Sequence, residues 1–463
     1  MGLLGLCAAA KCNGGVFFIS FCLWYTFQKP TERMMLLNLL FIHAWNPRET
    51  HYRGKFSSFF SYPSLTLPAL VALVPPELGY RVDCLDEMTQ RAWPKKKHYD
   101  VVAISFDTSS SQRAYELAKA YKAQGSYILF GGYHTSNMPE EALLHAGSVV
   151  IGPAEISLPM FLRDFAAGLP QRVYDYPDVL GVPIPVPQRG ANSLRKKLRV
   201  PTVIADRGCD NRCAFCAISQ MWRSNPRPVA EVVDEIRALK TKNVIFFDPN
   251  FFAPKTYARE LMTALLPLRV RWFANATADT AFDDDMLALA KKSGCRGVLI
   301  GLESVSARSL EGVGKRFRKV ERYKEVVGKF HSHGIQVNGC FVLGFDDDVE
   351  ESLLNLPRVV DELELDLTRF AILTPLPGSA LFQELDAAGR IVSRDWSLYT
   401  QRRAVFAPQN MTPERLEAIF QQVWKETFSW KRVFARACRR RKMEPLVRAA
   451  LFMANLGFKF LPN

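Results

Sequence analysis

Residues 207–216 read RGCDNRCAFC, and the cysteines of this stretch, Cys209, Cys213 and Cys216, are spaced C-x3-C-x2-C. Three thiolates so close together can bind three irons of a cubane cluster and leave the fourth iron without a protein ligand. An open metal position is where a substrate or cofactor can bind. A structural zinc site would close its shell with four ligands, and no fourth Cys or His lies nearby in the sequence. The spacing therefore favours a cluster with one open iron over three unrelated buried cysteines.

This loop, with an aromatic residue before its last cysteine, resembles the cluster loop of the radical S-adenosylmethionine (radical SAM) enzymes. In that family the cysteines hold a [4Fe-4S] cluster, and its open iron binds the methionine moiety of S-adenosylmethionine. One electron then splits the sulfonium to give a 5′-deoxyadenosyl radical. The resemblance extends from about Met35 to about Ser429. It implies that the three cysteines are the cluster ligands and that Phe215 lies beside the cosubstrate.

A chain of 463 residues is longer than a single hydrophobic core usually supports, so we expect two domains plus extensions. A hydrophobic content of 48% and a charged content of 23% are typical of a folded soluble protein. A low-potential cluster requires a reducing compartment, so we predict reduced thiols and a cytoplasmic protein. The other cysteines are scattered and make no second ligand set, which argues against an auxiliary cluster: Cys7, Cys12, Cys22, Cys84, Cys295, Cys340 and Cys438.

The formal net charge of +14 is placed unevenly along the chain. Residues 431–463 contain nine Lys or Arg against one acidic residue, Glu444, so more than half of the excess lies there. The rest of the chain is only mildly basic. We therefore expect no nucleic-acid partner, and the local basic tail is the feature that needs explaining.

The first 33 residues form a separate segment. Its apolar and aromatic run, residues 16–27, is shorter than the ~20 residues of a spanning helix. No small-residue cleavage site follows it. We predict that residues 1–33 are not part of the fold and reflect a misassigned translation start; a membrane anchor is the alternative.

Residues 34–180 alternate between apolar strand patterns and helical patterns. This succession predicts a doubly wound α/β sheet of flavodoxin- or Rossmann-like type, with a ligand site at the carboxyl ends of its strands. The expected strands and helices are, in order, strand 36–42, helix 65–78, strand 80–85, strand 100–105, helix 111–124, strand 127–130, helix 140–144 and strand 148–151.

A proline-rich linker, residues 181–198, separates this domain from a second one at residues 199–411. Six β/α units are expected in the second domain, which suits a partial (β/α)6 TIM-like barrel with its site at the carboxyl ends of the strands. The cysteine loop follows the first of these strands. The expected strands are 202–205, 244–248, 270–276, 297–301, 336–343 and 369–374.

The radical SAM resemblance implies further cofactor contacts at successive strand ends. Asp248 and Asn250 stand where relatives hold the methionyl amine, although Pro249 departs from the acidic pattern. Glu303 and Ser304 match the segment that approaches the ribose. Gly344 ends a glycine-spaced strand that lets the adenine approach the backbone. Taken singly, each is as well explained by an ordinary strand-end polar residue or turn glycine.

Three C-terminal segments, residues 374–379, 395–396 and 410–413, resemble the closing portion of one branch of the family. In that branch a cobalamin-binding domain precedes the radical SAM barrel. Glycines and hydroxyls at strand ends would let the backbone approach the corrin, and the implied cobalamin-binding residues are Ser105, Thr108, Gly131, Gly132 and His134. Residues 152–155, GPAE, stand where relatives usually carry an acidic motif. A flavodoxin-like domain that binds a nucleotide without cobalamin is the alternative.

Two departures limit what the resemblance implies. The Asp-x-His-x-x-Gly motif that ligates cobalt in cobalamin mutases is absent, and His43 and His51 lack its spacing. We therefore predict that neither ligates cobalt, and that His134 contacts the corrin periphery, orients a loop or is structural. Methylthiolating relatives carry a second three-cysteine set in the N-terminal domain. Its absence argues against methylthiolation.

The remaining residues, 412–463, predict a helical, basic extension. Thr412 is a helix cap with Pro413 in the first turn. A first apolar stripe is expected to pack on the barrel: Leu416, Ile419, Phe420, Val423 and Trp424. A second stripe continues it: Trp430, Val433, Phe434 and Ala437. A basic amphipathic helix with aromatics can lie on the inner face of a membrane; a basic face that packs on its own domain is the equal alternative.

The resemblance implies a cobalamin-dependent radical SAM enzyme that methylates an unactivated carbon. It would use a [4Fe-4S] cluster, S-adenosylmethionine and cobalamin, with a small-molecule or lipid substrate. An external one-electron reductant of flavodoxin or ferredoxin type is implied as well. A cyclase or rearrangement enzyme with the same cofactors, or a non-catalytic cobalamin or metal sensor, are the alternatives. No residue stands out as a substrate acid or base.

Overall fold

The computed structural model describes residues 37–49, 64–89, 98–176, 180–189, 200–312, 314, 319–439 and 445–460. The predictions for residues 1–33 and for His51 lie outside these described residues. One compact unit, Leu36–Asn463, contains both predicted domains. Within the described part of the chain, the helices are too short or too polar to span a bilayer.

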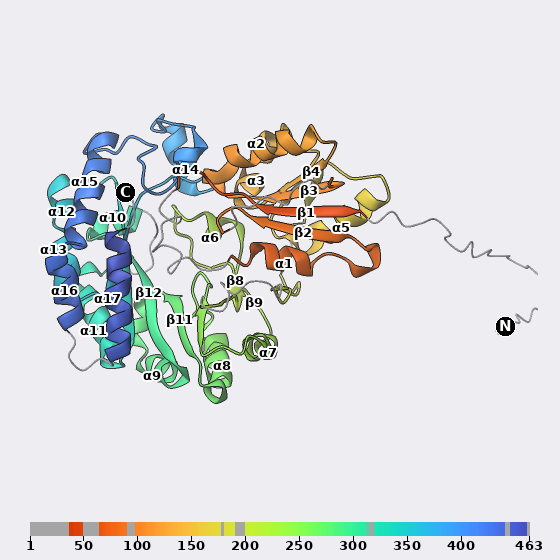
Figure 1. Ribbon diagram of the computed structural model, residues 1–463. Coiled ribbons are helices and arrows are strands. Elements are labelled where there is room, and N and C mark those ends of the chain that lie inside the picture. The colour runs from red at the N-terminus through yellow and green to blue at the C-terminus, as the bar shows by residue number, and fades with distance from the viewer. Residues whose placement is uncertain are drawn as a thin grey trace, which may run out of the picture. The chain divides into compact units, whose positions relative to one another are not determined.

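The first domain is a six-stranded parallel sheet in the order β2-β1-β3-β4-β5-β6 (Figure 1). The order reverses between β1 and β3, so the loops at their carboxyl ends diverge and leave room for a ligand. This confirms the predicted doubly wound sheet. The strands are β1 (Asn38–His43), β2 (Arg81–Asp86), β3 (Val101–Ser105), β4 (Tyr127–Gly131), β5 (Ser148–Ile151) and β6 (Val173–Asp175).

Helices cover both faces of this sheet because its central strands are apolar on both sides. In β1, Leu40 and Ile42 join a core cluster with α2 (Ser111–Lys122), while Leu39 and Phe41 join another. The second cluster contains Leu67 of α1 (Thr66–Ala72) and Leu158, Phe161 and Leu162 of α5 (Ala154–Ala166).

One local prediction for this domain is wrong, and three elements were not predicted. The single helix expected over residues 65–78 is divided into α1 and a 3-10 turn, Pro76–Leu78, since Pro75 and Pro76 have no N–H to continue the helical ladder. The short helix α3 (Tyr133–Asn137) was not predicted, because its Ser, Thr and Asn residues favour turns. Helix α5 and strand β6 were also missed.

The second domain is a parallel sheet in the order β14-β13-β12-β11-β10-β7, with β14 and β7 at its two edges. This confirms the open six-stranded barrel. The strands are β7 (Thr202–Val203), β10 (Asn243–Phe246), β11 (Arg271–Ala276), β12 (Cys295–Glu303), β13 (Gln336–Leu343) and β14 (Leu367–Ile372). Two short strands, β8 (Asp206–Arg207) and β9 (Asn225–Pro226), form an antiparallel pair between β7 and β10.

Helices follow the barrel strands and bury one side of the sheet around Trp272, which is fully buried. They are α6 (Ala217–Met221), α7 (Val229–Ala238), α8 (Lys255–Leu265), α9 (Asp284–Ser293), α10 (Ala307–Gly312), α11 (Tyr323–Ser332), α12 (Glu350–Leu354), α13 (Leu356–Glu362) and α14 (Ala380–Ala387).

The C-terminal extension contains α15 (Pro413–Thr427), α16 (Trp430–Arg439) and α17 (Pro445–Lys459). The Thr412 hydroxyl accepts a hydrogen bond from the Arg415 N–H at 3.2 Å, which confirms the cap. All five residues of the first predicted stripe are buried, which confirms the packing of α15. The second stripe is only partly right: Val433 is buried, but Trp430 and Phe434 are exposed.

A buried ion pair ties the start of α7 to the first barrel strand. Arg227 donates to the Glu235 carboxylate at 2.6 Å and to the Ile204 carbonyl at 2.9 Å. Arg189, from the linker between the domains, contacts the same carboxylate at 2.7 Å. The side chains of Arg227 and Glu235 are 1% and 2% exposed, so neither charge can be solvated if its partner is removed.

We predict that Glu235→Ala lowers the free energy of unfolding by about 3–5 kcal/mol, because it strands a buried guanidinium. The matched control is Asp234→Ala, which removes the exposed Asp234–Arg237 pair on the same helix and should cost at most about 1 kcal/mol. Urea denaturation followed by tryptophan fluorescence measures both. Equal losses for the two variants would contradict the prediction.

Candidate active site

The cysteine loop leaves and rejoins the barrel through the β8–β9 pair, in which Asp206 lies opposite Pro226 and Arg207 opposite Asn225. Inside this closure, the Cys209 N–H donates to the Trp222 carbonyl at 3.1 Å. The Cys216 N–H donates to the Cys213 carbonyl at 3.0 Å. The loop is therefore a closed turn that holds its three cysteines half-buried rather than a loose connection.

Gly208 is required for this closure. Its φ is +91°, and a Cβ placed on it would lie 1.9 Å from the Arg223 carbonyl oxygen. Only glycine combines a positive φ with such a close approach of two backbones. The sequence quoted at the start therefore depends on its glycine as well as on its cysteines.

Two buried aspartates hold the base of the loop. Asp206 accepts from the Ser224 hydroxyl at 2.6 Å and from the Asn225 N–H at 2.7 Å, and burial raises its pKa to about 6. Asp248, at the end of β10, accepts from the Ala205 N–H at 2.8 Å, and burial raises its pKa to about 8. The structure thus places the Asp248 carboxylate against the loop's own backbone.

Asn250 is the predicted residue with an unused acceptor. Its Oδ1 is buried and has no hydrogen-bond partner among the described residues. Its neighbour Asn275 donates instead to the Asp248 carbonyl at 2.7 Å. An orphaned amide oxygen beside the strand end that supports the cluster loop fits a bound ammonium group.

Glu303 and Ser304 lie at an irregularity in the sheet. The register between β12 and β13 shifts at Gly301 and Glu303, and Glu303 has a φ of +63°. Such backbone strain in a non-glycine residue concentrates at functional sites. The Tyr323 hydroxyl fixes the segment by donating to the carbonyls of Leu302 at 2.6 Å and Ser304 at 3.2 Å. The sequence did not single out Tyr323, because nothing in it reports this long-range contact.

Phe215 brings the cysteine loop to the end of β13. Its ring packs edge-on against Phe345 at 6.3 Å, next to Gly344. Gly344 has a φ of +107°, and Leu416 of α15 fills the space where its Cβ would lie, at 2.7 Å. The structure therefore gives Gly344 a packing reason to be glycine, and its contact with an adenine stays a prediction.

The number and spacing of the thiols in the cysteine loop fit a cubane cluster. No group of three or more His, Cys, Asp or Glu side chains that could hold one metal ion occurs among the described residues. In a cubane each thiolate binds a different iron, so the sulfurs need not converge on one point. Burial raises the pKa of Cys209, and bound iron would stabilise its thiolate instead.

At the predicted cobalamin edge, Ser105 and Gly131 are paired residues of β3 and β4. Gly132 has a φ of +106°, and a Cβ on it would lie 2.4 Å from the Phe106 carbonyl oxygen, so this glycine lets two loops pack. Gly152, with a φ of +74°, has nothing within 4 Å of its Cβ position. The backbone of this turn is therefore open to its surroundings.

His134 is fully buried and lies between protein groups. Nδ1 is 3.4 Å from the Thr108 hydroxyl and Nε2 is 3.4 Å from the Glu141 carboxylate. Burial opposes the charge of Glu141, but hydrogen bonds from His134 and Tyr115 outweigh it and lower its pKa. Trp396 donates to the same carboxylate at 3.1 Å. Of the alternatives for His134, this geometry supports orienting a loop.

The first domain touches the cysteine loop directly. The Tyr133 ring of α3 lies 4.9 Å from Trp222, and the Asn137 amide donates to the Met221 sulfur at 3.2 Å. Arg207 forms an ion pair with Glu155, the last residue of the GPAE segment. Sequence reasoning missed these contacts, because no local pattern reports which residues of two domains will meet.

We predict that Gly208→Ala prevents cluster assembly, since its methyl group would collide with the Arg223 carbonyl and open the loop. After anaerobic reconstitution, iron and sulfide content should fall several-fold while the circular dichroism spectrum persists. The control is Gly328→Ala in α11, where nothing lies within 4 Å of the added Cβ. Normal iron content in Gly208→Ala would show that the closure is dispensable.

The chain is similar to known proteins along most of its length. Residues 203–356 match the family model of the radical SAM superfamily. The chain is 30% identical over 372 residues to bacteriochlorophyllide d C-12(1)-methyltransferase of Chlorobaculum tepidum, covering 77% of this chain and 81% of the relative. It is 25% identical over 416 residues to bacteriochlorophyllide d C-8(2)-methyltransferase of the same organism, covering 85% and 92%.

The fold is also that of a solved structure. OxsB, a cobalamin-dependent S-adenosylmethionine radical enzyme solved with aqua-cobalamin and S-adenosylmethionine bound, superposes with a TM-score of 0.66 at 15% identity. The match covers 90% of this chain and 70% of OxsB, so it includes both domains. The chain therefore belongs to the radical SAM superfamily of enzymes, in the branch that joins an N-terminal cobalamin-binding-type domain to the radical SAM barrel.

Proposed function

We propose that this protein is a cobalamin-dependent radical SAM methyltransferase that methylates an unactivated carbon. The observation that carries the proposal is the direct contact between the cysteine loop and α3 of the first domain, through Tyr133 and Trp222. Helix α3 follows the carboxyl end of β4, where a doubly wound sheet binds its ligand. Ligands of the two domains would therefore lie on the two sides of one interface.

Different residues of the barrel would bind different parts of the cluster and of the S-adenosylmethionine. The three cysteines would hold the cluster, and the Asn250 Oδ1 would accept from the methionyl amine. Glu303 and Ser304, fixed by Tyr323, would face the ribose, and Phe215 would cover the cosubstrate. When bound, the cluster and its S-adenosylmethionine supply hydrogen abstraction, and cobalamin supplies the methyl group. Asp248 and Gly344 would act indirectly, by holding the loop base and the β13 end in place.

In the first domain, the edge formed by Ser105, Gly131 and Gly132 would approach the corrin, with the open turn at Gly152 beside it. Thr108 and His134 would not touch the corrin but would hold the edge in place, since both are buried in a hydrogen-bonded network. His43 lies 3.7 Å from Asp86, so its ring already faces a carboxylate of the neighbouring strand. The expectation that His43 does not ligate cobalt stays a prediction.

The substrate is proposed to be an apolar small molecule. Two relatives are named for the methylation of a bacteriochlorophyllide, so a tetrapyrrole is the first class to test. A lipid is the second. Electrons would come from an external donor of flavodoxin or ferredoxin type in the cytoplasm, because the cysteines need a reducing compartment. No nucleic-acid partner is proposed.

The decisive test is anaerobic reconstitution with iron, sulfide and hydroxocobalamin, followed by absorption spectroscopy and a 5′-deoxyadenosine assay. We predict that Cys213→Ala abolishes the cluster chromophore and deoxyadenosine release while corrinoid uptake persists, because the two sites lie in different domains. Cys438→Ala, an exposed cysteine far along the chain, is the control. Deoxyadenosine release by Cys213→Ala would rule out the assignment.

The product distinguishes the proposal from its alternatives. With a tetrapyrrole substrate, methylation adds the mass of one CH2 group, whereas ring closure or rearrangement does not. Corrinoid binding with no deoxyadenosine under reducing conditions would instead identify a sensor. Mass spectrometry of the extracted product, with labelled methionine in the S-adenosylmethionine, distinguishes methylation from ring closure or rearrangement. The deoxyadenosine assay identifies a sensor.

A further inference from the structure

Helix α16 is inverted relative to an ordinary amphipathic surface helix. Its arginines face the protein: Arg432 pairs with Asp361 and donates to the Pro357 carbonyl at 2.8 Å. Arg436 is 8% exposed, donates to the Thr427 carbonyl and lies 5.2 Å from the Phe428 ring. The guanidinium groups thus serve the packing of the extension together with Val433, while the aromatic side chains of Trp430 and Phe434 face outward.

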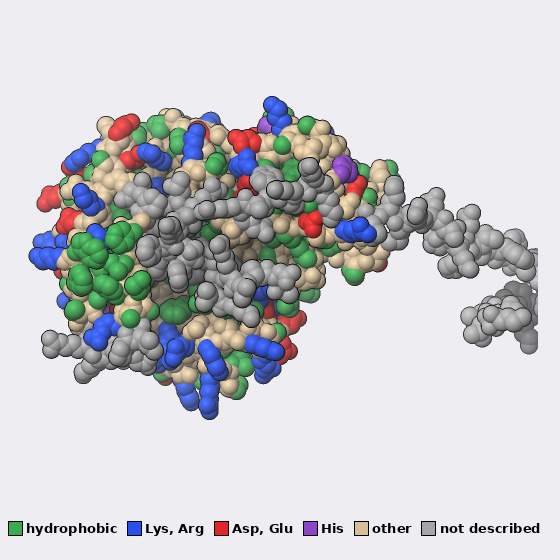
Figure 2. All heavy atoms as spheres, in the orientation of Figure 1, with side chains coloured by type: hydrophobic (Ala, Val, Ile, Leu, Met, Phe, Trp, Pro, Cys, Tyr) green, Lys and Arg blue, Asp and Glu red, His purple; other side chains and the backbone are tan. Residues whose placement is uncertain are grey.

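The outward side is aromatic. Trp430 and Phe434 are 48% and 52% exposed and stack on each other at 5.9 Å. Phe460 lies 6.1 Å from Trp430, and Phe452 lies 5.3 Å from Phe434. With Met453, which is 48% exposed, these side chains form one surface that we call the aromatic face. Figure 2 shows it as a continuous hydrophobic area where Figure 1 places α16 and α17, bordered by Lys and Arg side chains.

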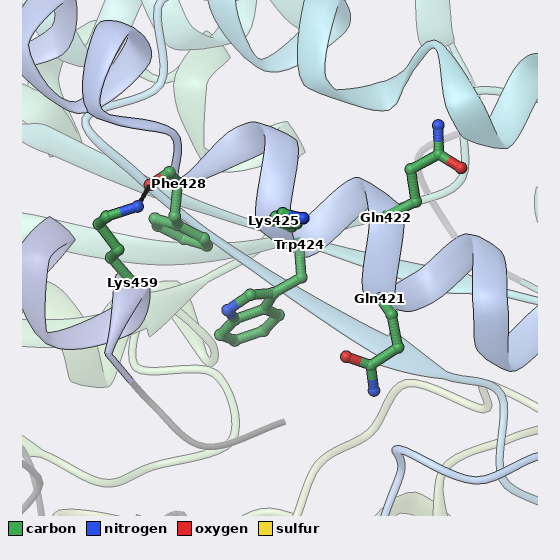
Figure 3. Close-up of a pocket in the computed structure, with 6 residues that line it drawn as sticks. All are labelled: Gln421, Gln422, Trp424, Lys425, Phe428 and Lys459. Atoms are coloured by element: carbon green, nitrogen blue, oxygen red, sulfur yellow. Dashed lines mark hydrogen bonds between the residues drawn. The ribbon is translucent and has the colours of Figure 1, made fainter.

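A cationic hollow adjoins the aromatic face. It has a volume of about 330 Å³ and lies between α15 and the end of α17, lined by Gln421, Gln422, Trp424, Lys425, Phe428 and Lys459 (Figure 3). Lys459 reaches from α17 to the Phe428 carbonyl at 3.4 Å, and its ammonium group also lies 5.1 Å from the Trp430 ring. One lysine therefore belongs to both the hollow and the edge of the aromatic face.

Exposed aromatics beside lysines fit an interface of apolar chains and anionic headgroups. Contiguous exposed apolar patches on soluble proteins mark interaction sites, and aromatics prefer the depth at which acyl chains meet headgroups. A second copy of this chain, packed face to face, would bring the adjoining lysines, Lys425 and Lys459, toward their own counterparts. The apolar run at residues 16–27 contains no charged residue, so it offers the lysines no counter-charge.

We propose that the aromatic face and the adjoining hollow are a docking site for an anionic phospholipid surface. Trp430, Phe434 and Phe460 would enter the headgroup region, and Lys425, Lys431 and Lys459 would contact phosphates. Hydrophobic insertion and charge each contribute, as for other interfacial helices. The site does not depend on the proposed methyl transfer.

The test is vesicle flotation of the full-length, reconstituted protein, with phosphatidylcholine alone and with phosphatidylcholine mixed with phosphatidylglycerol. The wild type should float only with the anionic vesicles, and binding should weaken with added salt. Trp430→Ser/Phe434→Ser should lower the bound fraction at least tenfold. Lys425→Ala and Lys459→Ala should each weaken partitioning about fivefold, since a lysine near the surface contributes about 1 kcal/mol.

The matched control is Leu144→Ser/Leu169→Ser, which removes two still more exposed apolar residues of the first domain and should bind like the wild type. Deoxyadenosine release should be unchanged in both double variants, which shows that each is folded. Wild-type flotation that the aromatic variant retains, or no flotation with anionic vesicles, would overturn the proposal. So would light scattering that shows a dimer which Trp430→Ser/Phe434→Ser converts to monomers, because the face would then join two copies.

Discussion

The structure depends on the closure of the cysteine loop at its base. A two-stranded ladder, a glycine pressed against the Arg223 carbonyl and the buried carboxylate of Asp206 hold the two ends of the loop together, and Asp248 fixes the backbone that leads into it. Each of these groups acts on backbone atoms, so the position of the thiols does not rely on the metal to gather them. A preorganised set of thiols of this kind would hold a cluster where the strand ends can reach it.

The same loop is also the meeting point of the two domains. Tyr133 and Asn137 touch the residues that follow the last cysteine, while Glu155 pairs with the residue before Gly208. The loop is thus held from the side of the first domain as well as from its own base. A shift of the first domain would be transmitted to the cluster ligands through packed side chains rather than through the linker.

The elements that the sequence predicted well are those with an unbroken local signal. The apolar run of β1, the alternation of β13 and the Thr412–Pro413 cap appear in the structure within a residue or two of their expected positions. The helix broken at Pro75 and the short α3 were misread because turn-forming residues give conflicting local preferences. For α16, periodicity identified an apolar stripe but could not tell which side is buried, since that is decided by Asp361 on another helix.

The candidate site, like the fold, could be predicted from the sequence only in part. The cysteine spacing predicted the metal ligands, but the orphaned Asn250 oxygen, the strained Glu303 and the Tyr323 hydroxyl that holds it emerge only from contacts between distant strands. The sequence also could not show that Asp248 and His134 face protein groups. Residue type sets what a side chain can do, whereas the neighbours that tertiary packing supplies set what it does.

The contact between Trp396 and Glu141 has a consequence for how the protein is made. The first domain emerges from the ribosome early, yet Glu141 and Asn46 find hydrogen-bond partners only at Trp396 and Ser397, 255 and 351 residues further along. Domains fold as they are synthesised, so the first sheet forms while these partners are still missing. The two contacts can therefore form only after synthesis has passed residue 397, and a nascent chain that stops earlier would carry the folded sheet without them.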